Sequence, residues 1–187
     1  MSEVNFGNDG DFSDEAMVRR VNNQLSNELG NLCQRTLSMV YKNCDKAFPV
    51  EIGPYMAEDE KLLETARSLH ERTSKAVSVQ AIQKYMEILI SIIRDSNKYI
   101  DEQAPWVLKK TDPARMKTVL YILLEVLRYS AILYQPIIPS SSNRILDQLM
   151  VPNSERTFHC LSDAFRIRPG TPMRGKPVVI FPRIEIP

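Results

Sequence analysis

The spacing of apolar residues predicts helices over most of the first 150 positions. Between residues 14 and 43 apolar side chains recur every three or four residues, as on one face of an amphipathic helix. They are Met17, Val18, Val21, Leu25, Leu29, Leu32 and Met39. The same spacing predicts further helices at about 57–76, 78–103, 113–134 and 141–150.

Residues that start and stop helices agree with these ranges. Ser13 is a good N-cap, and the acidic residues that follow it suit the positive end of the helix dipole. Asp112-Pro113 opens the fourth helix with a cap and a proline at its first position. Pro105 ends the third helix, because a proline pushes the preceding residue out of helical geometry. Pro136 and Pro139 end the fourth.

The two ends of the chain have a different character. Residues 1–13 are polar and contain two glycines, and we expect a linker there. Residues 153–187 contain two short β-prone runs, 165–167 and 178–181, which we interpret as a ribbon packing on something outside the bundle. The predicted fold is therefore all-α, a bundle of about five helices over residues 14–152 with a short irregular or β-ribbon tail.

Composition limits the possible partners and the compartment. The net charge is only +1, so any contact with nucleic acid should be small and local, and no DNA partner is expected. The most apolar stretch, 119–138, is interrupted by Glu125, Arg128 and Gln135, so it predicts a core helix and no membrane span. Three widely spaced cysteines and no signal segment favour a reducing intracellular compartment.

No catalytic or metal site can be assembled from the sequence. A di-metal bundle needs a glutamate three residues before each histidine, but arginines stand there, Arg67 before His70 and Arg156 before His159. The phosphate-binding glycine loops and the nucleophile elbow are also missing. We expect this chain to bind a partner rather than catalyse, with no catalytic residue, metal or cofactor of its own.

Asn31 and Arg35 are the first candidate binding residues. Their i, i+4 spacing places them together at the border of the apolar stripe of the first helix. An amide and a guanidinium offer donors and an acceptor to the edge of a base, and arginine can also stack. The alternative is a surface amide beside an arginine that lies over the rim of the core.

Pro105 and Trp106 form the second candidate group. Trp106 is the only tryptophan, and it lies just beyond the proline that ends a helix. An aromatic ring in that position can stack with an unpaired base, although it could equally cap the core. The pair Lys109 and Lys110 follows closely and suits either phosphate or solvent.

Several runs resemble the anticodon-binding domain of methionyl-tRNA synthetases. They are Asn22-Asn23-Gln24-Leu25-Ser26-Asn27-Glu28-Leu29-Gly30-Asn31-Leu32 with Arg35, Ser96-Asn97-Lys98-Tyr99-Ile100-Asp101-Glu102-Gln103-Ala104-Pro105-Trp106, the stretch from Glu125 to Pro139, and Phe181-Pro182-Arg183-Ile184. The resemblance implies recognition of the CAU anticodon loop of methionine tRNA. It implies that Trp106 stacks on the first anticodon base, that Asn31 and Arg35 bind base edges, and that Pro105 shapes the helix end.

The resemblance also implies partners outside the chain. The family's catalytic domain, which uses ATP and methionine, is missing from these residues, and the tail over 153–187 would pack toward it. The expected partners are the anticodon loop of methionine tRNA and this catalytic domain, in the cytoplasm or an organelle interior such as a mitochondrion or plastid. The alternative function is a helical protein–protein interaction module derived from the same domain.

Overall fold

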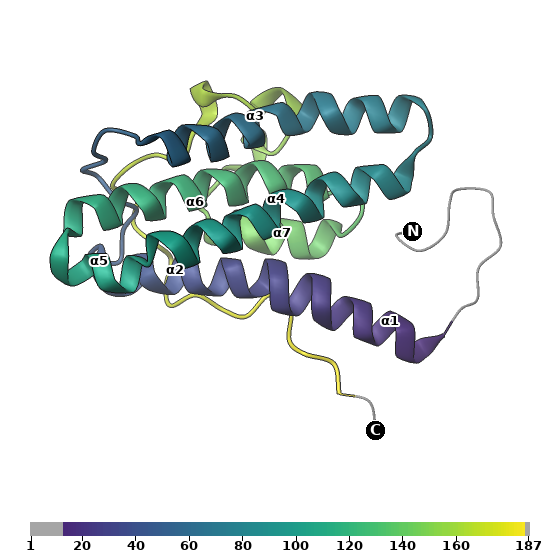
Figure 1. Ribbon diagram of the computed structural model, residues 1–187, viewed down its shortest axis with the longest axis horizontal. Helices are drawn as coiled ribbons and strands as arrows, with labels where there is room; N and C mark the ends of the chain where they lie inside the picture. Colours follow the sequence, from purple (N-terminus) through teal and green to yellow (C-terminus); the bar gives the residue numbers. More distant parts are fainter. Residues whose placement is uncertain (1–12, 186–187) are drawn as a thin grey trace.

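The predicted helix over residues 14–43 is present as one continuous rod in the computed structural model, which describes residues 13–185 (Figure 1). Its consecutive segments are α1 (Asp14–Arg20), the π-helical η1 (Val21–Gly30) and α2 (Asn31–Asn43). Ser13 caps its beginning, because the serine side chain accepts a hydrogen bond from the Ala16 N–H at 3.3 Å. The local signal at Ser13 therefore marks the true helix start. Apart from Ser13, the linker expected over 1–13 lies outside the described residues.

The other predicted helices are also present, with boundaries shifted by a few residues. They are α3 (Ala57–Ser78), α4 (Ile82–Gln103), α6 (Pro113–Tyr134) and α7 (Pro139–Gln148). The prediction that the third helix starts near Ser78 was wrong, since α3 continues through this residue. Gln80 then turns the chain with a left-handed φ of 56° before α4 begins. A short helix that the sequence analysis did not predict, α5 (Pro105–Thr111), connects α4 to α6.

Helix α6 lies at the centre of the bundle (Figure 1). Nearly all of its side chains are buried, because α2, α3, α4, α5 and α7 all pack against it. This explains why its sequence is apolar on every side. None of the helices in residues 13–185 has both the length and the apolar character needed to cross a membrane.

The tail is irregular, and its β-prone runs at 165–167 and 178–181 form no strand within the described residues. Three short 3-10 turns interrupt it: η2 (Asn153–Glu155), η3 (Phe158–Cys160) and η4 (Asp163–Phe165). Over the described part of the chain, the structure records one isolated bridge, between Ala47 and Pro172. Of the two forms expected for the tail, irregular or β-ribbon, the structure shows the irregular one.

A buried ion pair on α6 bonds the backbone of the tail between Cys160 and Ile167. Arg128 and Glu125 lie 2.9 Å apart and are almost completely buried. Arg128 donates hydrogen bonds to the carbonyl oxygens of Cys160, at 2.7 Å, and Ser162, at 3.2 Å, while Glu125 accepts from the Ile167 N–H. These side chains satisfy backbone groups that a strand partner would otherwise satisfy. Residues 160–167 therefore pack on α6 of the bundle, and the packing of the tail on something outside the bundle stays a prediction.

Candidate nucleic-acid interface

The corner between α4 and α5 presents the only tryptophan of the chain to solvent. Ala104 ends α4 in the left-handed region, with φ at 43°, and its N–H bonds to the Ile100 carbonyl at 3.0 Å. Pro105 then occupies the first position of α5, where its missing N–H costs nothing. Pro105 is buried, and Trp106 is 41% exposed. The proline thus anchors the corner and leaves the indole accessible.

Arg35 of α2 lies against this indole. Its guanidinium carbon is 5.2 Å from the centre of the Trp106 ring, within the range of a cation–π contact. The same guanidinium donates a hydrogen bond to the Asp101 carboxylate at 2.5 Å. Because Arg35 is 28% exposed and Asp101 63%, the pair faces solvent and contributes little to folding. These two contacts orient a charged, planar group beside an exposed aromatic ring.

Asn31 lies one helical turn before Arg35 on the same helix and is exposed. It is the first residue of α2, and its own N–H reaches back to the carbonyls of Glu28 and Ser26, so a π-type turn ends here. Asn31, Arg35 and Trp106 therefore lie on one surface formed by the first helix and the α4–α5 corner. Lys109 and Lys110 occupy the exposed last turn of α5.

A buried network of hydrogen bonds and one ion pair lies next to the α4–α5 corner. The Asp59 carboxylate, on α3, accepts hydrogen bonds from Arg115 of α6 and from the Tyr99 hydroxyl of α4. Arg115 also donates to the side-chain oxygen of Gln103 at 2.6 Å, one residue before the left-handed Ala104. The network thus ties the end of α4 to two neighbouring helices and fixes the direction in which Trp106 leaves the bundle.

Charge and burial shift several pKa values in this network. Burial alone would raise the pKa of the Asp59 carboxyl, but hydrogen bonds from Arg115 and Tyr99 outweigh it and leave the pKa below its usual value. Burial and the hydrogen bond to Asp59 both raise the pKa of the Tyr99 hydroxyl. The hydrogen bond to Asp59 raises the pKa of Arg115. At neutral pH the network therefore holds one carboxylate and one guanidinium.

The tail contacts the first helix close to Asn31. A Cβ added at Gly30 would lie 3.4 Å from the Phe181 side chain and 3.0 Å from the Leu25 carbonyl oxygen. The Asn22 amide also forms two hydrogen bonds of 2.8 Å with the backbone of Ile184. The glycine therefore gives the tail room to pack directly against the helix that carries Asn31.

Sequence reasoning singled out Asn31, Arg35, Pro105 and Trp106, and the structure brings the last three together with Asn31 one turn away. It missed Asp101 as the partner of Arg35. Asp101 precedes Trp106 by five residues, but a carboxylate near the end of a helix has no local feature that would distinguish it. The network of Asp59 and Arg115 was missed for the same reason. Such partners are identified only by their position in the fold.

Comparisons with known proteins agree on one family. Residues 50–185 match the family model described as the anticodon binding domain of methionyl tRNA ligase. Methionine–tRNA ligases of Rhizobium meliloti and Rickettsia felis are 42% and 46% identical to this chain, over 100% and 99% of its length. The chain spans 36% of the length of each of these relatives.

Solved structures give the same result. The ligand-free crystal structure of methionyl-tRNA synthetase from Mycobacterium tuberculosis matches with a TM-score of 0.93 and 43% identity, covering 99% of this chain and 37% of that one. A structure of the same enzyme bound by methionyl-adenylate matches with a TM-score of 0.91 and 43% identity, over 96% of this chain and 36% of that one. The chain therefore belongs to the family of the anticodon-binding domain of methionyl tRNA ligases.

Proposed function

We propose that this chain recognises the CAU anticodon loop of methionine tRNA, as the RNA-reading part of a methionine–tRNA ligase. Charging of the tRNA, with ATP and methionine, would be carried out by a catalytic domain outside these 187 residues. The observation that carries the proposal is the contact between Arg35 and the exposed ring of Trp106, with Asn31 one helical turn before Arg35. The cytoplasm or the interior of an organelle would be its place of action.

The arrangement suits unpaired bases rather than a duplex. Sequence-specific RNA recognition targets loop bases, which stack on aromatic rings and form hydrogen bonds along their edges. The exposed indole of Trp106 offers the stacking surface for the first anticodon base, and Pro105 sets its direction. Asn31 offers a donor and an acceptor, and Arg35 offers several donors in one plane, to the edges of the neighbouring bases.

Asp101 has a place in this proposal as a positioning residue. Its carboxylate holds the Arg35 guanidinium beside the indole before any RNA is present. A side chain that is already oriented loses less conformational entropy when it binds a base. The carboxylate also repels phosphate, so the space beside Arg35 favours the edge of a base over the RNA backbone.

The decisive experiment compares Trp106→Ala with Val107→Ala, an exposed neighbour on the same short helix. Binding of a labelled CAU stem-loop is followed by fluorescence anisotropy. Loss of a stacking platform costs about 1–3 kcal/mol per base, so Trp106→Ala should weaken binding by roughly 5- to 150-fold. The control should bind like the unmodified chain. Equal affinity of both variants, or equal affinity for CAU and for another triplet, would contradict the proposal.

A protein-interaction module is the second candidate, and the exposed tail favours it. Val178 and Val179 are 56% and 55% exposed although they are apolar. We infer that they pack against the catalytic domain, as the tail of this family is expected to do. A chain that binds the separate catalytic domain but shows no response to stem-loop RNA would favour the interaction module over RNA recognition.

A further inference from the structure

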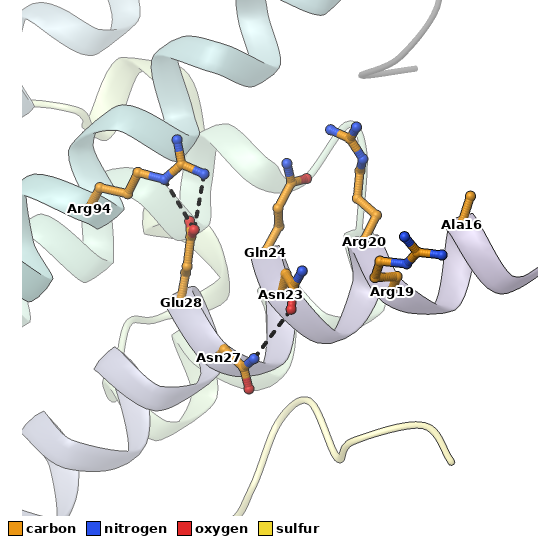
Figure 2. Close-up of a pocket in the computed structure, with 8 residues that line it drawn as sticks. All are labelled: Ala16, Arg19, Arg20, Asn23, Gln24, Asn27, Glu28 and Arg94. Atoms are coloured by element: carbon orange, nitrogen blue, oxygen red, sulfur yellow. Dashed lines mark hydrogen bonds and ion pairs between the residues drawn. The ribbon is translucent and has the colours of Figure 1, made fainter. Parts of the chain in front are cut away.

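Polar side chains continue from the candidate site along the first helix toward its beginning. Five polar residues follow one another at four-residue steps: Arg19, Asn23, Asn27, Asn31 and Arg35. All of them except Arg35 are classed as exposed. The Asn27 amide donates a hydrogen bond to the Asn23 side-chain oxygen at 3.5 Å, so these two share one face of the π-helical segment (Figure 2). From Asn23 to Arg35 the rod extends about 18 Å at the rise of an α-helix. We call Arg19, Asn23 and Asn27 the amide face.

An open hollow of about 550 Å³ lies beside the amide face, between the first helix and α4. Its polar lining consists largely of guanidinium and amide groups, contributed by Arg19, Arg20, Asn23, Gln24, Asn27 and Arg94 (Figure 2). Guanidinium groups and side-chain amides are common ligands of phosphate oxygens, to which they bind without regard to sequence. The hollow therefore has the chemistry of a site for the RNA backbone.

The charges around the hollow define where a phosphate can lie. Among the described residues that line it, Glu28 is the one acidic residue, and it is paired with Arg94 at 3.0 Å. Glu87 and Asp95 border an adjoining hollow on the α4 side, and Glu15 stands four residues before Arg19. Carboxylates repel phosphate, so a phosphate group binds most favourably along the amide face. This favourable region ends at Arg19.

The tail covers a neighbouring side of the same segment. Asn22 is bound to the Ile184 backbone, and Ser26 donates a hydrogen bond to the Pro182 carbonyl at 3.4 Å. The residues that directly follow these two, Asn23 and Asn27, remain exposed. Up to residue 185, the tail therefore holds the π-helical segment in place without covering the amide face. Departures from α-helical geometry are frequent at functional sites.

We propose that the amide face binds phosphates of the stem that adjoins the anticodon loop, and so extends the RNA-binding surface beyond the bases that are read. The inference rests on the proposed function, since it takes the loop to lie at Arg35 and Trp106. In this arrangement the residues around Arg35 and Trp106 determine which triplet is bound. The amide face binds the backbone of the stem whatever its sequence. The ligand is the sugar–phosphate backbone of RNA.

The test uses Arg19→Ala and the pair Asn23→Asp with Asn27→Asp in the whole chain. The exposed Arg72 on α3 provides a matched control, Arg72→Ala. Each variant is titrated at several salt concentrations with a CAU stem-loop, with a stem-loop of another triplet, and with the CAU loop as an oligonucleotide without a stem. Binding of each variant to the separate catalytic domain is measured in parallel. Circular dichroism and thermal unfolding check that the helices are retained.

Arg19→Ala should weaken binding of both stem-loops by roughly fivefold, as for one charge-assisted hydrogen bond reduced by solvent. The slope of log affinity against log salt should become shallower by about 1, because one phosphate contact is lost. The two aspartates should weaken binding further, because each places a carboxylate beside phosphate. The CAU preference, the affinity for the stemless loop and the Arg72→Ala control should remain unchanged.

The outcomes separate the inference from the proposed function. If the unmodified chain prefers CAU but Arg19→Ala and the aspartate variant bind the stem-loop equally well, the inference is overturned and the proposed function stands. If the variants lose only their affinity for the separate catalytic domain, the amide face is a protein contact and the inference is again overturned. If the unmodified chain shows no RNA binding at all, both are overturned.

Discussion

Replacing Asp59 by asparagine tests how strongly the buried network holds the bundle. Asp59 is completely buried and accepts from Arg115 at 2.8 Å, from the Tyr99 hydroxyl at 2.6 Å and from the Met56 N–H at 2.8 Å. A second hydrogen bond from Arg115 completes a bidentate ion pair. Asparagine keeps the volume but removes the charge, and it puts an NH₂ group where an oxygen accepts hydrogen bonds.

The expected cost follows from what remains in the interior. Arg115 is 8% exposed and would keep its positive charge without a counter-charge. Removing one partner of a buried ion pair destabilises a protein by about 3–5 kcal/mol. A domain has about 5–15 kcal/mol of stability in all, so Asp59→Asn should remove a large part of it. The loss of stability should affect α3, α4 and α6 together, since the network joins these three helices.

The same substitution should change the dependence of stability on pH. The pKa of the Asp59 carboxyl is below its usual value in the folded chain. Such a group stabilises the fold at pH values above its unfolded pKa, and this stabilisation is lost as the pH falls through the lower, folded pKa. The unmodified chain should therefore lose stability in acid. Asp59→Asn should lack this part of the acid loss, because the amide does not titrate.

Urea unfolding followed by circular dichroism, at neutral and at acidic pH, measures both effects. Glu58→Gln provides the control, because Glu58 is the exposed neighbour at the same helix start and its replacement should cost only about 0.3–1 kcal/mol of helix-dipole energy. The reasoning fails if Asp59→Asn is as stable as the control at neutral pH. It also fails if both variants lose the same free energy of unfolding between neutral and acidic pH.

Three further outcomes can be measured. Gly30→Ala should lower the thermal midpoint, because its Cβ would lie 3.0 Å from the Leu25 carbonyl oxygen, which must shift at a cost of about 1–3 kcal/mol, more than the roughly 1 kcal/mol gained from the higher helix propensity of alanine; an unchanged or higher midpoint would show that this carbonyl shifts freely. Asp101→Asn should keep the free energy of unfolding within about 0.5 kcal/mol but reduce the CAU preference measured by anisotropy. Burial raises the pKa of Cys33 to about 12, so this thiol should resist iodoacetamide in the folded chain at mildly alkaline pH, and rapid labelling would contradict its burial.

Local signals in the sequence were enough to predict the helices of the bundle other than the short α5. The caps at Ser13 and Asp112 and the proline at 113 act within one helical turn, so they work without knowledge of the rest of the fold. The apolar stretch 119–138, interrupted by Glu125, Arg128 and Gln135, correctly predicted a core helix, which ends at Tyr134. These features depend on residues that are close together in the sequence, so they can be recognised from the sequence alone.

Features that depend on distant residues could not be predicted in this way. The two β-prone runs of the tail bond to side chains instead of a strand: Glu125 accepts from the Ile167 N–H, and Arg144 and Gln148 bond the backbone of 178–180. Helix α5 begins at the same proline that ends α4, which a proline signal alone does not reveal. Asp101 became part of the candidate site only because α4 packs beside α2 and brings it to Arg35.

The two halves of the candidate site are fixed to the bundle by different means, and this bears on how a nearly neutral chain could bind RNA. The Trp106 side is held by the buried network that reaches Gln103, and the Asn31 side is held by the tail packed at Gly30. Neither half needs RNA to become ordered, so binding would lose little free energy to ordering the site. Stacking and hydrogen bonds to a few bases could then supply the affinity that strongly basic proteins obtain from many phosphates. A net charge of +1 is consistent with this mode of recognition, in which geometry contributes more than total charge.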